Sequence, residues 1–181
     1  MKKFELTNEF IANRFGTKLF RIRALVEFGD VEAGELGGYV EKESNLGHDD
    51  NAWVYGNARV YGDALVYDNA RVYDNAWVYG NAQVSGNARV YGNARVCGNG
   101  DYAYAHGFGS VNRTTTFFRL KDGGVGVRCG CFYGTLAQFR DKIRETHGET
   151  KKAQEYLMLA DLMELRFEED ENEVGNRKYV E

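Results

Sequence analysis

The chain has 181 residues, of which 23 are lysine or arginine and 27 are aspartate or glutamate, giving a formal net charge of −4. Hydrophobic residues make up 43% and charged residues 28%, which excludes a disordered tail, and the absence of proline excludes a collagen-like chain. Glycine is enriched, with 22 residues where an average chain of this length holds about 13.

Residues 1–39 carry no repeat. The alternation of apolar and polar residues over 17–26 predicts a β-strand, and the glycines that follow it mark turns. Short strands further along the chain would present unpaired edges at the end of their stack. We therefore expect residues 1–39 to form a β cap over that end.

A strict repeat begins at Asn51 and ends at Gly98. It consists of eight hexapeptides, NAWVYG, NARVYG, DALVYD, NARVYD, NAWVYG, NAQVSG, NARVYG and NARVCG. Because alternate residues of a strand point to opposite sides, the alanine and valine of each unit face inward together. The Gly-Asn, Asp-Asn and Gly-Asp pairs supply corners that tolerate positive φ. The alanine and valine side chains of every hexapeptide face the same side of the chain. The chain must therefore wind in one direction, and each strand stacks on the strand one full turn away.

The repeated Val-x-Gly-Asn-Ala-x pattern resembles the hexapeptide-repeat superfamily. With the lead-in at residues 19–46, it is similar to small hexapeptide proteins of bacteriophages and prophages. The resemblance implies a left-handed parallel β-helix with three hexapeptides, about 18 residues, in each triangular coil. We therefore predict a mainly β fold with an N-terminal β cap (1–39), a short left-handed β-helix (40–105) and a small C-terminal α+β module (106–181).

The C-terminal module is predicted to contain a hairpin and two helices. Residues 114–120 and 125–132 are predicted to form two strands joined by a Lys-Asp-Gly-Gly turn. A capping-box pattern opens a helix over 135–148, and a second helix follows over 151–167. The apolar stripes of both helices predict core packing, and the acidic run at 168–173 predicts a solvated end.

A threefold coil sorts the outward side chains of the repeat into three faces. They are Trp53/Tyr55, Arg71/Tyr73 and Arg89/Tyr91 on the first face; Arg59/Tyr61, Trp77/Tyr79 and Arg95/Cys97 on the second; and Leu65/Tyr67 and Gln83/Ser85 on the third.

Such aromatic and cationic faces have two interpretations, which can coexist. One is subunit packing, since the superfamily commonly forms homotrimers. The other is a site where tyrosine, tryptophan and arginine bind a base, a nucleotide or a partner protein by stacking and cation–π contacts. The candidate binding residues on these faces are Tyr55, Arg59, Tyr61, Arg71, Tyr73, Trp77, Tyr79, Arg89, Tyr91 and Arg95.

The polar segment at 107–116 is a further candidate site. Ser110, Asn112, Arg113 and Thr114 carry groups that suit an anionic ligand, and the neighbouring glycines expose backbone N–H groups. The segment matches neither a P-loop nor a Rossmann fingerprint. The alternative interpretation is a turn that leads into a strand.

Catalytic and metal-binding signals are weak. Many hexapeptide enzymes are acyltransferases with a histidine base, so the resemblance makes His106, just past the last coil, the candidate in an enzymatic interpretation. His48 lies in an insertion, and both histidines have surface or capping roles as alternatives. Cys129 and Cys131 lack the second pair of a zinc site and are expected to be buried together. We predict no metal and no cofactor.

The resemblance to phage hexapeptide proteins implies a non-enzymatic binding protein. The specific expectation is an inhibitor of host antiviral defence that sequesters a nucleotide signal or blocks a defence protein. An acyltransferase-like enzyme and a structural or assembly protein remain alternatives. Three cysteines and no long apolar stretch favour the host cytoplasm and no membrane, and the mild acidity argues against duplex DNA as a partner.

Overall fold

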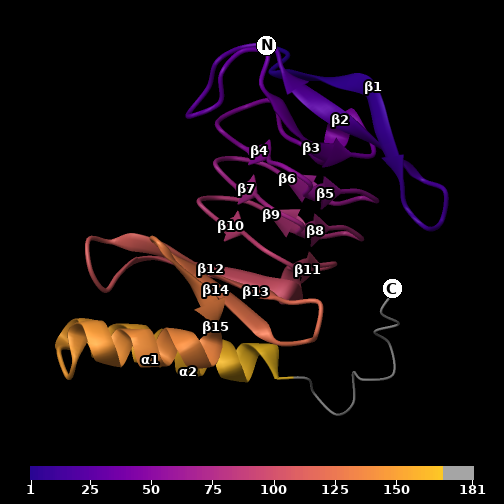
Figure 1. Ribbon diagram of the computed structural model, residues 1–181. Helices are drawn as coiled ribbons and strands as arrows, with labels where there is room; N and C mark the ends of the chain where they lie inside the picture. Colours follow the sequence, from indigo (N-terminus) through magenta and orange to yellow (C-terminus); the bar gives the residue numbers. More distant parts are fainter. Residues whose placement is uncertain (169–181) are drawn as a thin grey trace.

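The computed structural model describes residues 1–168 (Figure 1). An N-terminal sheet leads into a short parallel β-solenoid of about three turns, and the solenoid stands on a C-terminal antiparallel sheet with two helices beneath it. The predicted fold class is therefore confirmed, while the left-handed sense of the coil stays a prediction. No helix within residues 1–168 is long and apolar enough to cross a membrane.

The solenoid consists of two-residue strands that pair in parallel across successive coils. They are β4 (Trp53–Val54), β5 (Arg59–Val60), β6 (Leu65–Val66), β7 (Arg71–Val72), β8 (Trp77–Val78), β9 (Gln83–Val84), β10 (Arg89–Val90) and β11 (Arg95–Val96). The pairs β4–β7–β10, β5–β8–β11 and β6–β9 form three faces, as the 18-residue period predicts. The alanine and valine of every hexapeptide are buried inside.

The corners of the coils use positive φ, as expected for glycine. Asp68 and Asp74 occupy the same corner position with φ of 56° and 59°. Their carboxylates accept the backbone N–H of Gly86 and Gly92 in the next coil, at 3.0 and 3.2 Å. At these two corners aspartate stands in place of the conformationally freer glycine, and its carboxylate forms a hydrogen bond to the next coil.

The N-terminal sheet is continuous with the second solenoid face. β1 (Phe4–Ala12), β2 (Lys18–Ala24) and β3 (Leu36–Val40) are antiparallel, and β3 then pairs in parallel with β5. The short 3₁₀ helix η1 (Glu43–Asn45) leads from β3 toward the first hexapeptide. The predicted boundary at 39/40 therefore falls inside β3, which both parts share.

The cap also covers part of the first face. Trp53, expected among the outward aromatic side chains, is fully buried. The rings of Phe4 and Phe28 meet its indole edge-on, with centroids 6.2 and 5.3 Å away. Beside them the buried Lys3 ammonium donates to the carbonyl of Ala52 at 2.9 Å. Trp53, which points outward from the first coil, is thus a core residue of the cap.

The opposite end of the solenoid is closed by side chains. The 3₁₀ helix η2 (Asn99–Asp101) places the Asn99 side-chain oxygen 2.8 Å from the N–H of Gln83. The Tyr102 hydroxyl donates to the Gln83 carbonyl at 2.6 Å and accepts the N–H of Ser85 at 3.3 Å. These groups take the place of a further coil beneath β9.

The C-terminal sheet has the order β12 (Tyr102–Phe108), β13 (Arg113–Arg119), β14 (Val125–Cys129) and β15 (Phe132–Thr135). The predicted hairpin is therefore its central pair, and the predicted boundary at 105/106 lies within β12. The helices α1 (Leu136–His147) and α2 (Lys151–Phe167) pack on each other and on the sheet. The predicted capping box at the start of α1 is present. Most of the acidic run at 168–173 lies outside the described residues.

Candidate functional site: the arginine groove

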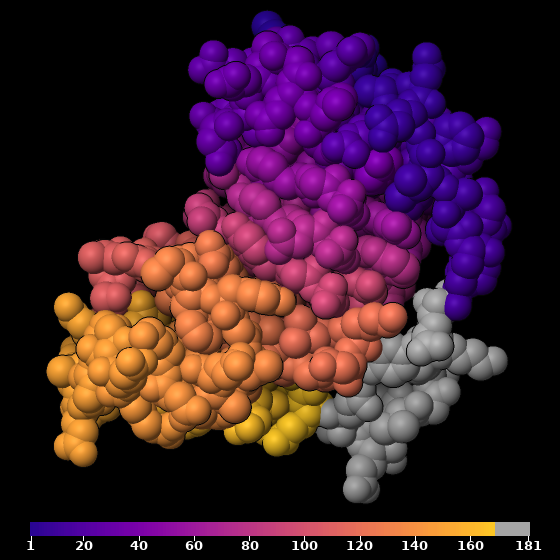
Figure 2. Space-filling model, viewed as in Figure 1, coloured from indigo at the N-terminus to yellow at the C-terminus, as the bar shows by residue number. Residues whose placement is uncertain are grey.

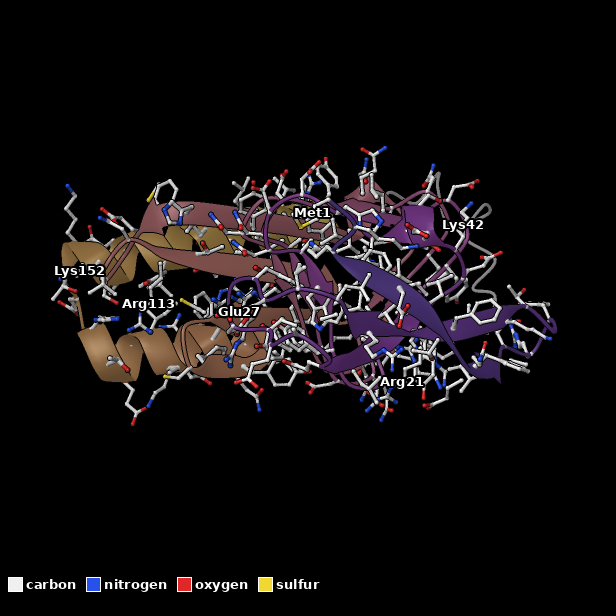
Figure 3. All side chains as sticks on the ribbon, turned by 90° about the horizontal axis from the view of Figure 1, so that it is seen from above. Met1, Arg21, Glu27, Lys42, Arg113 and Lys152 are labelled. Atoms are coloured by element: carbon white, nitrogen blue, oxygen red, sulfur yellow. The ribbon has the colours of Figure 1, made fainter. Side chains whose placement is uncertain are left out.

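The C-terminal sheet extends past the side of the solenoid, and the two bodies meet at an inner corner on the left of Figures 1 and 2. Seen from above, Arg113 lies on this overhanging part, well to one side of Met1 at the solenoid's N-terminal end (Figure 3). A cavity of about 620 Å³ lies where the first solenoid face meets the sheet. We call it the arginine groove, and it is lined by Asn69, Arg71, Asn87, Arg89, His106, Arg113, Thr114, Arg128 and Gly130.

Two separate parts of the fold bring the four arginines of the groove together. Arg71 and Arg89 pair in register on β7 and β10, so they stand one strand spacing, about 4.8 Å, apart along the solenoid. Arg113 begins β13 and Arg128 lies on β14. The backbone N–H of Arg89 donates to Oγ1 of Thr116 on β13 at 3.0 Å, which fixes the sheet against the solenoid.

The groove is strongly positive in a chain whose net charge is −4. Arg71 has an acidic partner, since its Nη1 lies 2.6 Å from a carboxylate oxygen of Asp30 in the N-terminal cap. Within residues 1–168, Arg89, Arg113 and Arg128 form no salt bridge. A concave surface lined by unpaired cations concentrates anions, so the groove is suited to an anionic ligand.

Arg128 is held in position from behind. Its guanidinium lies 4.5 Å from the centroid of the Tyr91 ring, and Nη1 donates to the carbonyl of Cys131 at 3.2 Å. Its Nε is buried and forms no hydrogen bond to any atom of residues 1–168. The sequence interpretation missed this residue, although strand alternation places it on the opposite side of β14 from Val127 and Cys129.

A column of stacked tyrosines borders the groove. Tyr73 lies between Tyr55 and Tyr91, with ring centroids 4.4 and 4.2 Å away. Arg128 covers Tyr91, and the Tyr55 hydroxyl donates to Asp30 at 3.0 Å. Burial raises the pKa of the Tyr55 and Tyr91 hydroxyls, so both stay protonated at neutral pH. Both faces of the Tyr73 ring are covered, so Tyr73 has no free face on which a base could stack. The column of tyrosines instead supports the arginines of the groove.

The candidates of the second face form a separate cluster. Trp77 lies between the guanidinium groups of Arg59 and Arg95, which are 5.0 and 4.0 Å from its ring centroid. Tyr61 stacks on Tyr79 at 5.2 Å, and burial raises the pKa of Tyr79 to about 12. None of these residues lines the arginine groove.

The two candidate histidines have different surroundings. His106 lines the groove, and its Nδ1 lies 2.9 Å from Oγ1 of Thr114. His48 accepts the N–H of Lys3 at Nδ1, and its Nε2 lies 2.9 Å from Glu43. Both ring nitrogens of His48 are thus engaged, which agrees with the capping interpretation.

The structure divides the polar segment at 107–116. Arg113 and Thr114 line the groove, whereas Ser110 and Asn112 lie in the turn between β12 and β13 and do not. The Ser110 N–H donates to the Tyr156 hydroxyl on α2 at 3.1 Å, and Asn112 has a positive φ of 49°. Both residues therefore lie in the turn that leads into β13, and their role as ligand contacts stays a prediction.

The expectation of a buried Cys129–Cys131 pair is wrong. Cys129 is half-buried at the end of β14, but Cys131 is exposed, because the strand stops and Gly130 turns the chain with φ of 58°. Within residues 1–168, no three or more His, Cys, Asp or Glu side chains are placed to hold a metal ion.

The parallel coils and the hexapeptide register define the chain as a β-solenoid repeat protein. Its repeat segment matches the family model described as YdcK Beta solenoid repeat, over residues 52–67, 64–80 and 82–99. The match covers the coils and leaves the cap and the C-terminal wall of the groove outside. The chain matches no curated protein.

Proposed function

We propose that this β-solenoid is a non-enzymatic binding protein that holds a phosphate-bearing, nucleotide-type ligand in the arginine groove. The observation that carries the proposal is the convergence of four guanidinium groups on one cavity, three of them without a carboxylate partner in residues 1–168. Arginine presents a planar fork of donors that matches phosphate oxygens. Asn69, Asn87 and Thr114 add neutral donors along the same walls.

The composition of the groove favours binding over catalysis. Among residues 1–168 its lining contains no carboxylate and no cysteine, so this part of the chain supplies neither an acidic general base nor a thiol nucleophile. A carboxylate in the groove would also repel phosphate.

Calorimetry with inorganic tripolyphosphate tests the proposal. We expect binding that weakens as ionic strength rises from about 0.01 to 0.15 M, because the contacts are charged and partly exposed. The double variant Arg89→Gln/Arg113→Gln should bind at least about tenfold more weakly. The matched control is Arg14→Gln/Arg144→Gln, which changes the net charge equally at exposed positions outside the groove. Equal losses in both double variants, or no binding by the parent, would overturn the proposal.

The biological role that we propose is inhibition of host antiviral defence by a phage-type protein, through sequestration of a nucleotide signal. The cationic lining of the groove supports it, together with the resemblance of the repeat to phage hexapeptide proteins. Phage plating on a defence-active host should improve when the parent protein is expressed and not with Arg89→Gln/Arg113→Gln. Equal rescue by both proteins would instead favour the blocking of a defence protein through another surface.

We further propose that the protein is a homotrimer, as is common for hexapeptide proteins. Native mass spectrometry reports the number of subunits and the mass of any retained ligand in one measurement. A monomer at micromolar concentration would contradict the trimer without affecting the binding proposal.

An acyltransferase-like enzyme is the second candidate, and it is favoured by the position of His106 on the groove wall. The arginines would hold the phosphates of an acyl-CoA, and His106 would act as the general base that removes the proton of an acceptor hydroxyl or amine. The acceptor would then attack the thioester carbonyl, and coenzyme A would leave as its thiol. Turnover of acetyl-CoA that is lost in His106→Ala, with tripolyphosphate binding unchanged, would support this candidate. Absence of turnover by the parent protein in the presence of hydroxyl and amine acceptors would contradict this candidate for those acceptors.

A further inference from the structure

A second cavity, of about 240 Å³, adjoins the arginine groove. We call it the aromatic pocket, and it lies between the β12–β13 turn, the β14–β15 turn and α1. Its apolar lining consists of Phe132, Phe139, Ile143 and Tyr156. Arg113, Lys142, Thr146 and His147 add polar and cationic groups.

The two cavities share a wall. Arg113 lines both of them, and Gly130 lines the groove while its neighbour Cys131 lines the pocket. A Cβ on Gly130 would clash with the Arg113 guanidinium, so glycine lets this side chain lie against the β14–β15 turn. One guanidinium is therefore placed between a cationic groove and an aromatic pocket.

The pocket is preformed and has free polar groups. Phe139 packs against Phe132 and Tyr156 with ring centroids 5.4 and 5.8 Å away. Within residues 1–168, neither the Arg113 guanidinium nor the His147 ring hydrogen-bonds to a protein atom. Ligand pockets for drug-sized molecules span roughly 300–1,000 Å³, so this smaller cavity suits one planar ring system and not a whole nucleotide.

We propose that the two cavities form one bipartite site for a free nucleoside polyphosphate. The phosphates lie in the arginine groove, the base lies in the aromatic pocket, and Arg113 contacts the ligand where the two parts meet. The partly exposed ring of Phe132 receives the base by stacking or edge contact, since Phe139 and Tyr156 are buried and form the floor of the pocket. The hydroxyl of Thr146 and the ring of His147 supply hydrogen bonds to the edge of the base. This inference rests on the proposed function, since it assumes that phosphate binds in the groove.

The test compares ATP, GTP, CTP and UTP with tripolyphosphate, by calorimetry on the full chain. At least one nucleotide should bind ten times more tightly than tripolyphosphate, because only a nucleotide also fills the pocket. Thr146→Trp places an indole at the pocket and should remove this difference while leaving tripolyphosphate affinity unchanged. The control Ala137→Trp changes an exposed position of α1 that lines neither cavity, and it should keep the preference.

Alkylation by iodoacetamide gives a second readout without a substitution. Cys131 is exposed and lines the pocket, whereas Cys97 is exposed and lines neither cavity. The preferred nucleotide should slow alkylation of Cys131 several-fold and leave Cys97 unchanged, and tripolyphosphate should protect neither.

The outcomes separate this inference from the proposed function. Tripolyphosphate binding without any nucleotide preference would overturn the bipartite site and leave the anion-binding groove standing. A preference that survives Thr146→Trp, without protection of Cys131, would place the base elsewhere and overturn the inference too. Failure of both tripolyphosphate and nucleotides to bind would overturn the proposed function itself.

Discussion

Asp101 and Arg119 form a buried ion pair, with Oδ1 and Nε 3.4 Å apart and both side chains only 6% exposed. The other carboxylate oxygen of Asp101 accepts the N–H of Cys97 at 2.9 Å, just after the last solenoid strand. Arg119 donates to the carbonyl of Phe167 at 3.0 Å, at the end of α2. The pair thus connects the last coil, β13 and α2.

Replacing Asp101 with alanine should destabilise the protein by about 3–5 kcal/mol, because it removes a carboxylate from the buried Arg119 guanidinium. It also removes the acceptor of the Cys97 and Gly98 N–H groups. Urea denaturation followed by circular dichroism measures the change. The exposed pair of Lys42 and Asp63 provides the control, since Lys42→Ala should cost less than about 1 kcal/mol. Similar losses in the two variants would contradict a special role for the buried pair.

Asp74 allows two opposing effects to be separated. Asp74→Ala keeps the strain of a side chain at positive φ and loses the hydrogen bond to Gly92, so we expect a loss of about 1–3 kcal/mol. Asp74→Gly loses the same bond but relieves strain of roughly 1–2 kcal/mol, and its net effect should be small. The unfolding midpoints of the two variants measure this difference in stability. Equal midpoints would show that the corner carries no backbone strain.

Gly38 lies where the cap meets the solenoid. A Cβ there would meet the carbonyl oxygen of Ala58 at 2.6 Å and Cγ1 of Val54 at 2.7 Å. Gly38→Ala should therefore cost about 1–3 kcal/mol through overpacking, because a backbone carbonyl in a parallel strand pair cannot move away freely. Gly100→Ala is the control. A Cβ at Gly100 meets no atom of the described residues within 4 Å, apart from its chain neighbours, so this variant should leave the melting temperature nearly unchanged.

The buried Lys3 side chain should make the free energy of unfolding increase with pH. Burial lowers its pKa to about 8, against the attraction of Asp50 and Asp49. Between pH 8 and about 10.5 the unfolded chain retains a proton that the folded protein has released, so the free energy of unfolding rises. Above about pH 10 the raised pKa of Tyr79 acts in the opposite direction, because the unfolded chain then loses its tyrosine protons first.

The denaturation midpoint of the parent protein should therefore increase from pH 8 to 10 and fall above that range. Lys3→Met should remove the increase and keep the fall. A variant whose profile rises between pH 8 and 10 like that of the parent would assign the effect to another group.

The solenoid was predictable because its period is local. One hexapeptide determines which side chains point inward, and three hexapeptides determine which residues stack, so Arg71 was correctly placed beside Arg89. The burial of Trp53 was not predictable in the same way. Its outward orientation follows from strand alternation, but its cover comes from Phe4 and Phe28, which lie far away in the sequence.

The arginine groove was predictable only in part. Its cationic residues could be named from the repeat and from the segment after it, but their convergence depends on how the C-terminal sheet packs against the coils. That packing includes individual long-range hydrogen bonds. Examples are the bond from the N–H of Arg89 to Oγ1 of Thr116 and the bond from the N–H of Lys121 to the carbonyl of Asn93. The periodic patterns in the sequence contain no information about such contacts. Arg128 was missed for the same reason.

The closure of the solenoid at both ends also bears on how this architecture can change during evolution. β3 begins the second face, and Asn99 and Tyr102 close the third, while the strand pairing between the coils repeats every 18 residues. A gene duplication or deletion of one complete 18-residue coil therefore leaves both terminations intact, since paired residues such as Arg71 and Arg89 differ by that number. Each such event would lengthen or shorten the molecule by one strand spacing, about 4.8 Å. Insertions whose length is not a multiple of 18 would move the aromatic and cationic rows out of register.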